Sequence, residues 1–176
     1  DRLLEGLLLT MIHEGPKVIE DPNNYDAQAN IMWAGMMAHN NSCGVGRNQD
    51  WGSHQIEHEL STVSDCAHGA GLAVVFPAWM TYNMNKNRFA QLAVRVWGVQ
   101  MDFDHPEITA KQGIVALKNY LKSIGMPSNL KELGVDEKDI DKMVQTACYG
   151  DGAGGSVGGC YPLDAKDVTN VYQMMT

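Results

Sequence analysis

The sequence has few basic side chains, no closely spaced cysteine pair and no long apolar run. It has 13 Lys and Arg against 21 Asp and Glu, and this net charge of -8 gives no electrostatic basis for binding nucleic acid or an anionic membrane. No apolar run reaches the about 18 residues that span a bilayer, and no basic segment with an apolar core marks a secretory leader. These absences favour a soluble enzyme that acts on small molecules.

The four cysteines are scattered singly along the chain, at Cys43, Cys66, Cys148 and Cys160. Without C-x-x-C pairs they do not form the pattern of a zinc ribbon or of a disulfide framework. We therefore expect a reducing, cytoplasmic environment.

Alternation of apolar and polar residues, which marks half-buried strands, is almost absent. The 44% hydrophobic composition of the 176 residues can supply a substantial core, and no repeat or low-complexity linker divides the chain. We predict an all-α fold that forms one domain over residues 1–176. The expected helices are an N-terminal helix that Gly15-Pro16 should end or kink, then about 26–40, a short helix around His54, 67–82, 88–97, one opening at Asp104-His105-Pro106, and two nearer the C-terminus.

The helix expected over residues 26–40 is rich in alanine and methionine and contains Trp33. Its apolar residues cover much of its circumference, so we predict a buried, central helix. The later helices are expected to begin at aspartate caps: Asp104, Asp136, Asp139, Asp164 and Asp167.

Three of the six histidines lie within residues 50–77, DWGSHQIEHELSTVSDCAHGAGLAVVFP. His54 and His58 are four residues apart, so on a helix they share one face and can reach a common ion or substrate. His68 precedes Gly69-Ala70-Gly71, small residues that let another element or a ligand approach the backbone. A histidine pair alone is more often a solvated or hydrogen-bonded pair than a ligand set, but the wider pattern favours a metal site.

Two short patterns within this segment allow other interpretations. His54 to His58 spells H-x-x-E-H, the zinc motif of inverzincin peptidases, in which both histidines would bind zinc and Glu57 would be the general base. Asp50 and His54 reproduce an Asp-x-x-x-His spacing, but we interpret Asp50 or Ser53 as a helix cap.

The whole pattern of residues 50–77 resembles the second metal-binding motif of the iron-containing (group III) alcohol dehydrogenases. The resemblance continues through DRLLEGLLLTMI, NYDAQANIMWAGMMAHN, FAQLAVRVWG and SIGMP, and it is closest to the butanol dehydrogenase branch. It implies the multi-helical C-terminal domain of the dehydroquinate synthase-like, iron-containing alcohol dehydrogenase fold.

This resemblance implies that His54 and His68 bind a divalent metal, with iron expected and zinc or nickel as alternatives. It implies that His58 lies beside the alcohol or aldehyde substrate and the nicotinamide and relays a proton. The family's other two ligands, an Asp and a His four residues apart, belong to a preceding helix that this sequence does not include.

The chain is therefore expected to be a C-terminal fragment, incomplete at its N-terminus, of an enzyme that binds NAD or NADP mainly through an N-terminal domain. The intact enzyme is expected to be a homo-oligomer that interconverts butanol-like primary alcohols and aldehydes. A noncatalytic helical module remains an alternative for the fragment.

Residues 150–155 satisfy G-x-G-x-x-G, the fingerprint of dinucleotide binding. That fingerprint needs a preceding strand and a following helix, and neither is predicted here. We interpret the stretch as a loop.

Overall fold

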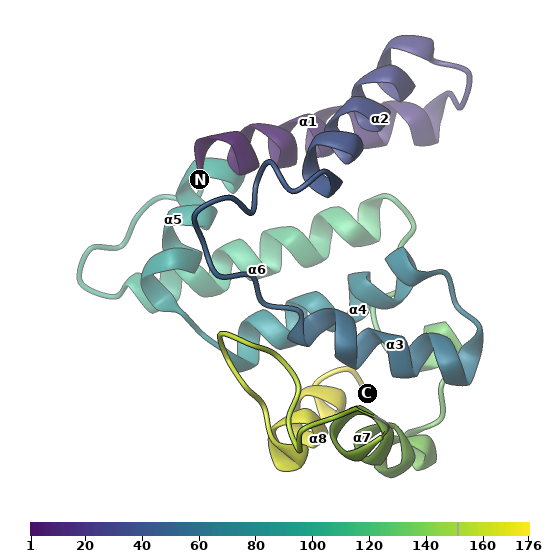
Figure 1. Cartoon of the computed structure of the whole chain (residues 1–176). Helices are drawn as coiled ribbons and strands as arrows, with labels where there is room; N and C mark the ends of the chain where they lie inside the picture. Colours follow the sequence, from purple (N-terminus) through teal and green to yellow (C-terminus); the bar gives the residue numbers. More distant parts are fainter. Residues whose placement is uncertain (151) are drawn as a thin grey trace. The chain divides into compact units, whose positions relative to one another are not determined.

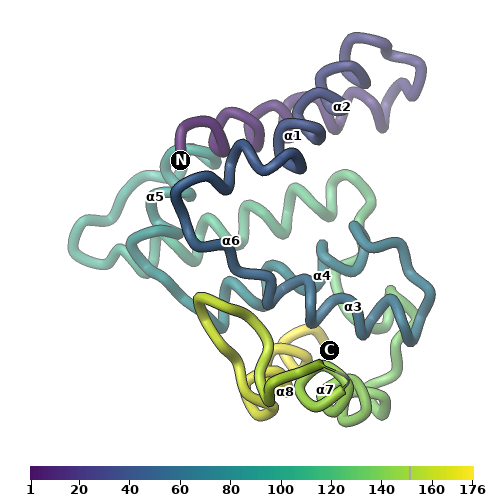
Figure 2. The backbone as a smooth tube through the Cα atoms, in the orientation of Figure 1, coloured from purple at the N-terminus to yellow at the C-terminus, as the bar shows by residue number. Residues whose placement is uncertain are grey.

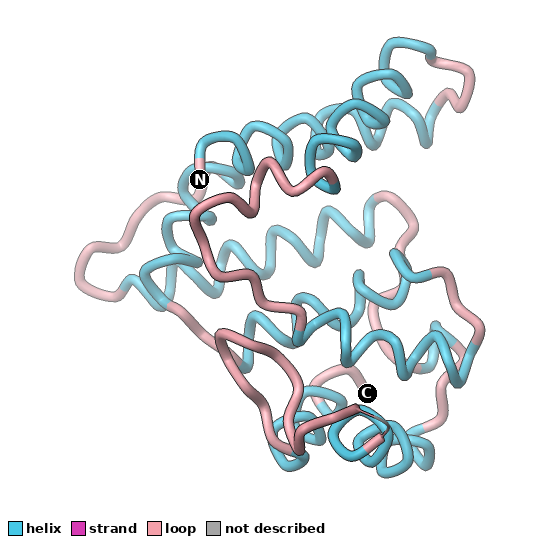
Figure 3. Tube along the Cα trace, in the orientation of Figure 1, coloured by secondary structure: helices cyan, strands magenta, loops and turns pink. Residues whose placement is uncertain are grey.

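The computed structural model of this protein describes residues 1–150 and 152–176, and these ranges contain helices and loops but no named strand (Figures 1 and 3). An antiparallel bridge joins Val157 and Leu163. The all-α prediction is therefore confirmed. Within the described ranges, none of the helices combines the length and the apolar character needed to cross a bilayer.

The chain divides into two compact units, residues 1–47 with 86–125 and residues 48–85 with 126–176. Each unit is thus made of two stretches that are distant in the sequence. The single domain over residues 1–176 stays a prediction.

The first unit contains α1 (Arg2–Glu20), α2 (Tyr25–His39), α5 (Lys86–Trp97) and α6 (Pro106–Ser123). The α1 and α2 helices form an antiparallel hairpin (Figure 2). The α5 and α6 helices approach closely at Gly113, where an added Cβ would lie 2.5 Å from the Cβ of Ala93. Only a residue without a side chain permits that approach.

The α1 helix continues through Gly15-Pro16 to Glu20, so this dipeptide does not end the helix, and the alternative of a kink stays a prediction. Proline removes one backbone N–H from the helix. In this part of the helix, the hydroxyl of Tyr120 donates to the carbonyl of Met11 at 2.7 Å. Gly15 leaves room for this hydroxyl, because a Cβ there would lie 2.5 Å from it. A tertiary hydrogen bond therefore supports the helix beside its proline.

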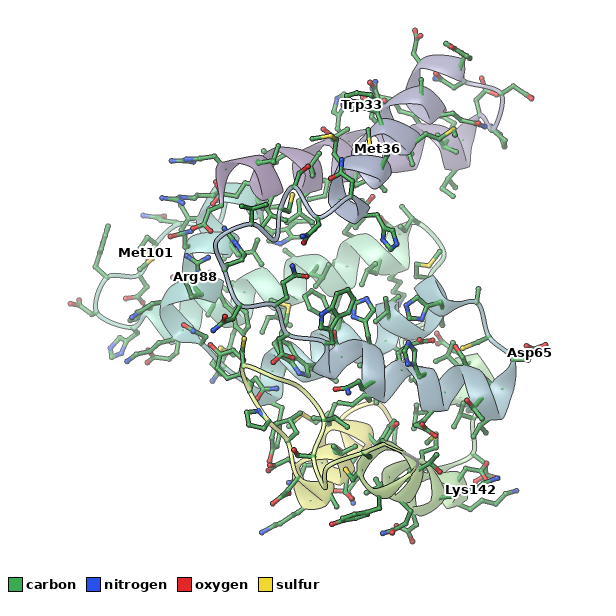
Figure 4. The ribbon with its side chains drawn as sticks, in the orientation of Figure 1. Trp33, Met36, Asp65, Arg88, Met101 and Lys142 are labelled. Carbon is green, nitrogen blue, oxygen red and sulfur yellow. The ribbon has the colours of Figure 1, made fainter. Side chains whose placement is uncertain are left out.

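The α2 helix lies where the sequence predicts a helix, but its predicted burial is wrong. Met32 is 74% exposed and Trp33 is 66% exposed, and Figure 4 marks Trp33 and Met36 on this helix. The helix packs chiefly against α1 and buries Ala27 and Ala34. The apolar residues around the circumference of α2 therefore did not indicate a buried helix.

The second unit contains α3 (Gly52–Ser64), α4 (His68–Tyr82), α7 (Ile140–Tyr149), α8 (Ala165–Gln173) and two short 3-10 helices, η1 (Lys131–Leu133) and η2 (Glu137–Asp139). Its core includes fully buried residues from α3, α4, α7 and α8: Ile56, Leu60, Val75, Met143, Val168 and Tyr172. The hydroxyl of Tyr172 donates to the carbonyl of Ile56 at 2.8 Å. This bond ties α8 directly to the helix that carries His54 and His58.

The helix ends follow the predicted caps in part. Asp164 and Asp167 form a reciprocal capping box at the start of α8, and Asp136 accepts from the N–H of Lys138. Asp139 precedes α7 but makes no capping bond with its side chain. The cap of α6 is His105, one residue after the predicted Asp104. The side chain of Asp102 accepts the backbone N–H groups of Asp104 and His105, and this turn places the start of the helix after His105.

Candidate functional site

The α3 and α4 helices form a hairpin that places the histidine motif on two adjacent helices. Asp65, which is labelled in Figure 4, ends α3 in the left-handed conformation with φ of 53°. The chain then reverses over three residues, and α4 begins at His68. The start of α4 is thereby held against α3.

All three histidines that the sequence singles out come together in this hairpin. The ring centroid of His68 lies 5.4 Å from that of His54 and 5.6 Å from that of His58. The half-exposed ring of Trp51 meets His54 edge-on, with the centroids 4.9 Å apart. The three imidazoles therefore form one cluster, which reaches solvent through His58 and His68.

The carboxylate of Glu57, for which the resemblance implies no role in a dehydrogenase, completes the cluster. Glu57 is fully buried, and a hydrogen bond joins its Oε2 to the Nδ1 of His68. The hydroxyl of Ser61, one helical turn later, donates to Oε1 at 2.5 Å. A side chain with no exposed surface cannot activate a solvent water, so the H-x-x-E-H peptidase prediction is not supported. The sequence alone does not distinguish a Glu57 that is hydrogen-bonded to His68 from a Glu57 that acts as the general base of a peptidase.

Three side chains of the cluster can each direct one ligand atom to a common point. Atoms of Glu57, His58 and His68 all lie within 4.8 Å of one another. Both oxygens of Glu57 are already hydrogen-bonded, to Ser61 and His68, so this carboxylate is better placed to orient an imidazole than to bind an ion. The imidazoles of His58 and His68 are therefore better placed than the carboxylate to offer an atom to a ligand.

Gly71 explains how a buried glutamate fits between the two helices. A Cβ at Gly71 would lie 2.3 Å from Oε1 and 2.7 Å from Cγ of Glu57. The close approach expected from the small residues after His68 is thus found at Gly71. At Gly69 a Cβ would meet nothing within 4 Å, so the structure has room for a side chain at Gly69 but not at Gly71.

Asp50 anchors a C-terminal loop to the start of α3. Its carboxylate accepts four backbone N–H groups, from Gly52, Gly159, Cys160 and Tyr161. Burial opposes the charge of Asp50, but these donors outweigh burial and lower its pKa below the ordinary value. The cap predicted at Asp50 or Ser53 is wrong in detail: Trp51 precedes the helix, Ser53 lies within it, and Asp50 mainly holds the loop. The loop's N–H donors lie about 110 residues away, a separation that no local pattern reveals.

An open hollow of about 310 Å³ lies beside His58 in the same unit. Its lining comes from α3, from the end of α7 and from the glycines that follow: Gln55, His58, Glu59, Thr146, Ala147, Gly150, Gly152 and Ala153. The stretch 150–155 follows the α7 helix and precedes no helix before α8, as expected of a loop, and its Asp151 lies outside the described residues. Small groups that reach His58 from this side would meet polar side chains.

Comparison with known proteins gives a consistent result over the full length of the chain. Residues 1–176 match the family model described as Fe-containing alcohol dehydrogenase family, C-terminal. The chain is 35% identical over 176 residues to NADH-dependent butanol dehydrogenase A of Clostridium acetobutylicum, covering 98% of this chain and 44% of that protein. It is 37% identical over 147 residues to NADPH-dependent aldehyde reductase YqhD of Escherichia coli, covering 82% and 38%.

Solved structures agree with these sequence matches. An NADH-dependent butanol dehydrogenase A from Thermotoga maritima superposes with a TM-score of 0.88 at 38% identity, covering 98% of this chain and 44% of that one. The aldehyde reductase YqhD from E. coli gives a TM-score of 0.90 at 30% identity, covering 100% and 46%. The chain thus spans less than half the length of these relatives.

Proposed function

Because the chain belongs to the iron-containing alcohol dehydrogenase family and matches the model of its C-terminal part, we propose that it is the metal-binding part of an NAD(P)-dependent alcohol dehydrogenase. The reaction would interconvert primary, butanol-like alcohols and their aldehydes. The observation that carries the proposal is the meeting of His54, His58 and His68 where α4 starts against α3. The names of the relatives, butanol dehydrogenases and an aldehyde reductase, support the substrate class.

In this proposal His54 and His68 hold the divalent metal. Neutral imidazoles accept iron, zinc or nickel, and the family favours iron. The contact of Glu57 with Nδ1 of His68 leaves Nε2 of that ring as its available nitrogen. A bound divalent ion would act as a Lewis acid that polarises the alcohol or aldehyde oxygen.

His58 is proposed as the residue that moves the proton. Its ring adjoins His68, and it lines the open hollow of the same unit, so a substrate hydroxyl placed there can reach it. An imidazole at this position can accept the hydroxyl proton during alcohol oxidation and return it during aldehyde reduction. His58 is therefore assigned to acid-base chemistry and not to holding the ion.

The remaining parts of the enzyme are proposed from the relatives. NAD or NADP would be bound mainly by an N-terminal domain outside these residues, because the relatives are NADH- or NADPH-dependent and more than twice as long. The intact enzyme would be a cytoplasmic homo-oligomer. The relatives give no support to a noncatalytic module.

The test uses the longest product of the gene that encodes this chain, purified with its metal. We expect it to oxidise primary alcohols with NAD or NADP. The variants His54→Ala and His68→Ala should lose the metal on dialysis. The variant His58→Ala should keep the metal while kcat falls by about 10²- to 10⁴-fold, the usual contribution of a general acid-base group.

The exposed His105, which lies outside the cluster, provides the control, since His105→Ala should change neither metal content nor rate. Loss of the metal from the His58 variant would contradict the division of roles. An enzyme that reduces no NAD or NADP in the presence of primary alcohols would contradict the proposed function.

A further inference from the structure

Glu57 is an acidic side chain buried completely between two helices, and each of its two oxygens has a hydrogen-bond partner. Its exposed fraction is 0%. Burying a charged group is costly unless hydrogen bonds satisfy it. Both oxygens have such partners, Ser61 on the same helix and His68 on the next. The chain therefore maintains a carboxylate at this place against the cost of its burial.

The contact with His68 fixes which ring nitrogen carries hydrogen. A carboxylate oxygen accepts hydrogen bonds, so this contact forms when the Nδ1 of His68 carries the hydrogen and donates toward Glu57. A neutral imidazole with hydrogen on Nδ1 has its lone pair on Nε2. The ring of His68 is about half exposed, so this lone pair is available to a ligand.

Two neighbours hold the carboxylate in this position. The hydroxyl of Ser61 donates to Oε1 at 2.5 Å, which leaves Oε2 for His68. Gly71 provides the space, because a Cβ there would lie 2.3 Å from Oε1 of Glu57. Rotation of the carboxylate away from His68 would break both hydrogen bonds.

We propose that Glu57 is a positioning residue that holds His68 in the Nδ1–H tautomer and presents its Nε2 to the metal. Ser61 and Gly71 keep the Glu57 carboxylate in place. The assignment of Nε2 to a metal rests on the proposed function, whereas the tautomer of His68 does not. Partners that orient a metal-binding histidine typically change metal affinity by about 10- to 100-fold when they are replaced.

The first experiment measures the His68 tautomer in the gene's longest product, prepared without metal, by two-bond ¹H–¹⁵N correlation NMR of the imidazoles above the pKa of free histidine. We expect His68 in the Nδ1–H form. In Glu57→Leu, which has similar volume but no acceptor, His68 should lose that form. In Glu57→Gln the side-chain carbonyl can still accept from Nδ1, so the Nδ1–H form should persist.

Glu59→Gln provides a matched control on the same helix. Glu59 is partly buried and the histidine that acts on it electrostatically is His58, so its replacement should leave the tautomer of His68 unchanged. The wild-type spectrum alone can overturn the inference, if it gives His68 with hydrogen on Nε2. A Glu57→Leu chain that keeps the Nδ1–H form would also overturn it. If that variant does not fold, Gly71→Ala, which displaces Glu57 without removing it, takes its place.

The second experiment measures Zn²⁺ affinity by competition with a chelator in the gene's longest product. Glu57→Leu should weaken Zn²⁺ binding by about 10- to 100-fold, and Glu57→Gln should weaken it less. Unchanged Zn²⁺ affinity in Glu57→Leu, while His68→Ala abolishes binding, would overturn the positioning role. Unchanged affinity in His54→Ala and His68→Ala would instead contradict the proposed function and leave the tautomer result standing.

Discussion

Gly69 and Gly71 lie on the same turn of α4 but differ in what surrounds them. A side chain at Gly71 would overlap the Glu57 carboxylate, and one at Gly69 would point into open space. A helix interior disfavours glycine by about 1 kcal/mol relative to alanine. The sequence presents the two glycines as equivalent, so the difference between them arises only from the packing of α3.

Gly71→Ala is expected to lower the free energy of unfolding by about 1–3 kcal/mol, the usual cost of adding an atom to a packed site. Gly69→Ala should leave it unchanged or raise it by up to about 1 kcal/mol through helix propensity. Urea midpoints of the two variants, followed by circular dichroism, check this difference. Equal midpoints would mean that Glu57 moves freely between the helices.

At the scale of secondary-structure elements, the site depends on contacts that reach α3 from the C-terminal part of the chain. Asp50 holds the loop at 159–161 through the backbone N–H groups of all three residues. The amide of Gly158 donates to Gln55 at 2.6 Å. The α8 helix contributes the bond from Tyr172 to Ile56. These contacts hold the chain just before His54 and α3 between His54 and His58.

The anchoring of the loop by Asp50 should depend on pH. Because the folded pKa of Asp50 is lowered, its stabilisation is complete above the ordinary aspartate value of about 3.9 and is lost as the pH falls through the lowered pKa. The backbone amide shifts of Gly159, Cys160 and Tyr161 should therefore titrate together, with a midpoint below about 3.9.

The isosteric variant Asp50→Asn is the control, and its amide shifts should show no common titration in this range. A common midpoint at or above the ordinary aspartate value in the wild-type chain would be inconsistent with the network of four N–H donors.

Tyr172→Phe removes the hydroxyl that joins α8 to α3 and keeps the ring. The side chain of Tyr172 is fully buried, and burial raises its pKa, so the hydroxyl stays protonated and donates throughout the neutral range. We expect the free energy of unfolding to fall by about 1 kcal/mol, the net value of one buried hydrogen bond. Chemical denaturation measures this change, with the exposed Tyr25→Phe as a control that should cause none.

At the scale of the whole molecule, the helices and their order could be predicted from local patterns. The signals lie within single helices: apolar periodicity along each helix, Pro106 in the first turn of α6 and the Asp164 capping box of α8. The spacing of the histidines likewise indicated the segment in which the three imidazole rings come together. The exposure of α2, the Glu57 contact and the Asp50 network depend on tertiary partners, which no local pattern specifies.

The division of each unit between two stretches of sequence has a consequence for how the protein is made. As the chain leaves the ribosome, the first unit lacks α5 and α6 until residue 125 has been synthesised. The histidine hairpin emerges earlier than α7 and α8, which complete its core and end near residue 176. Nascent chains usually fold domain by domain, but here the core around α3 and α4 is complete only after residues 126–176 have been synthesised. During that interval their apolar faces are available to chaperones.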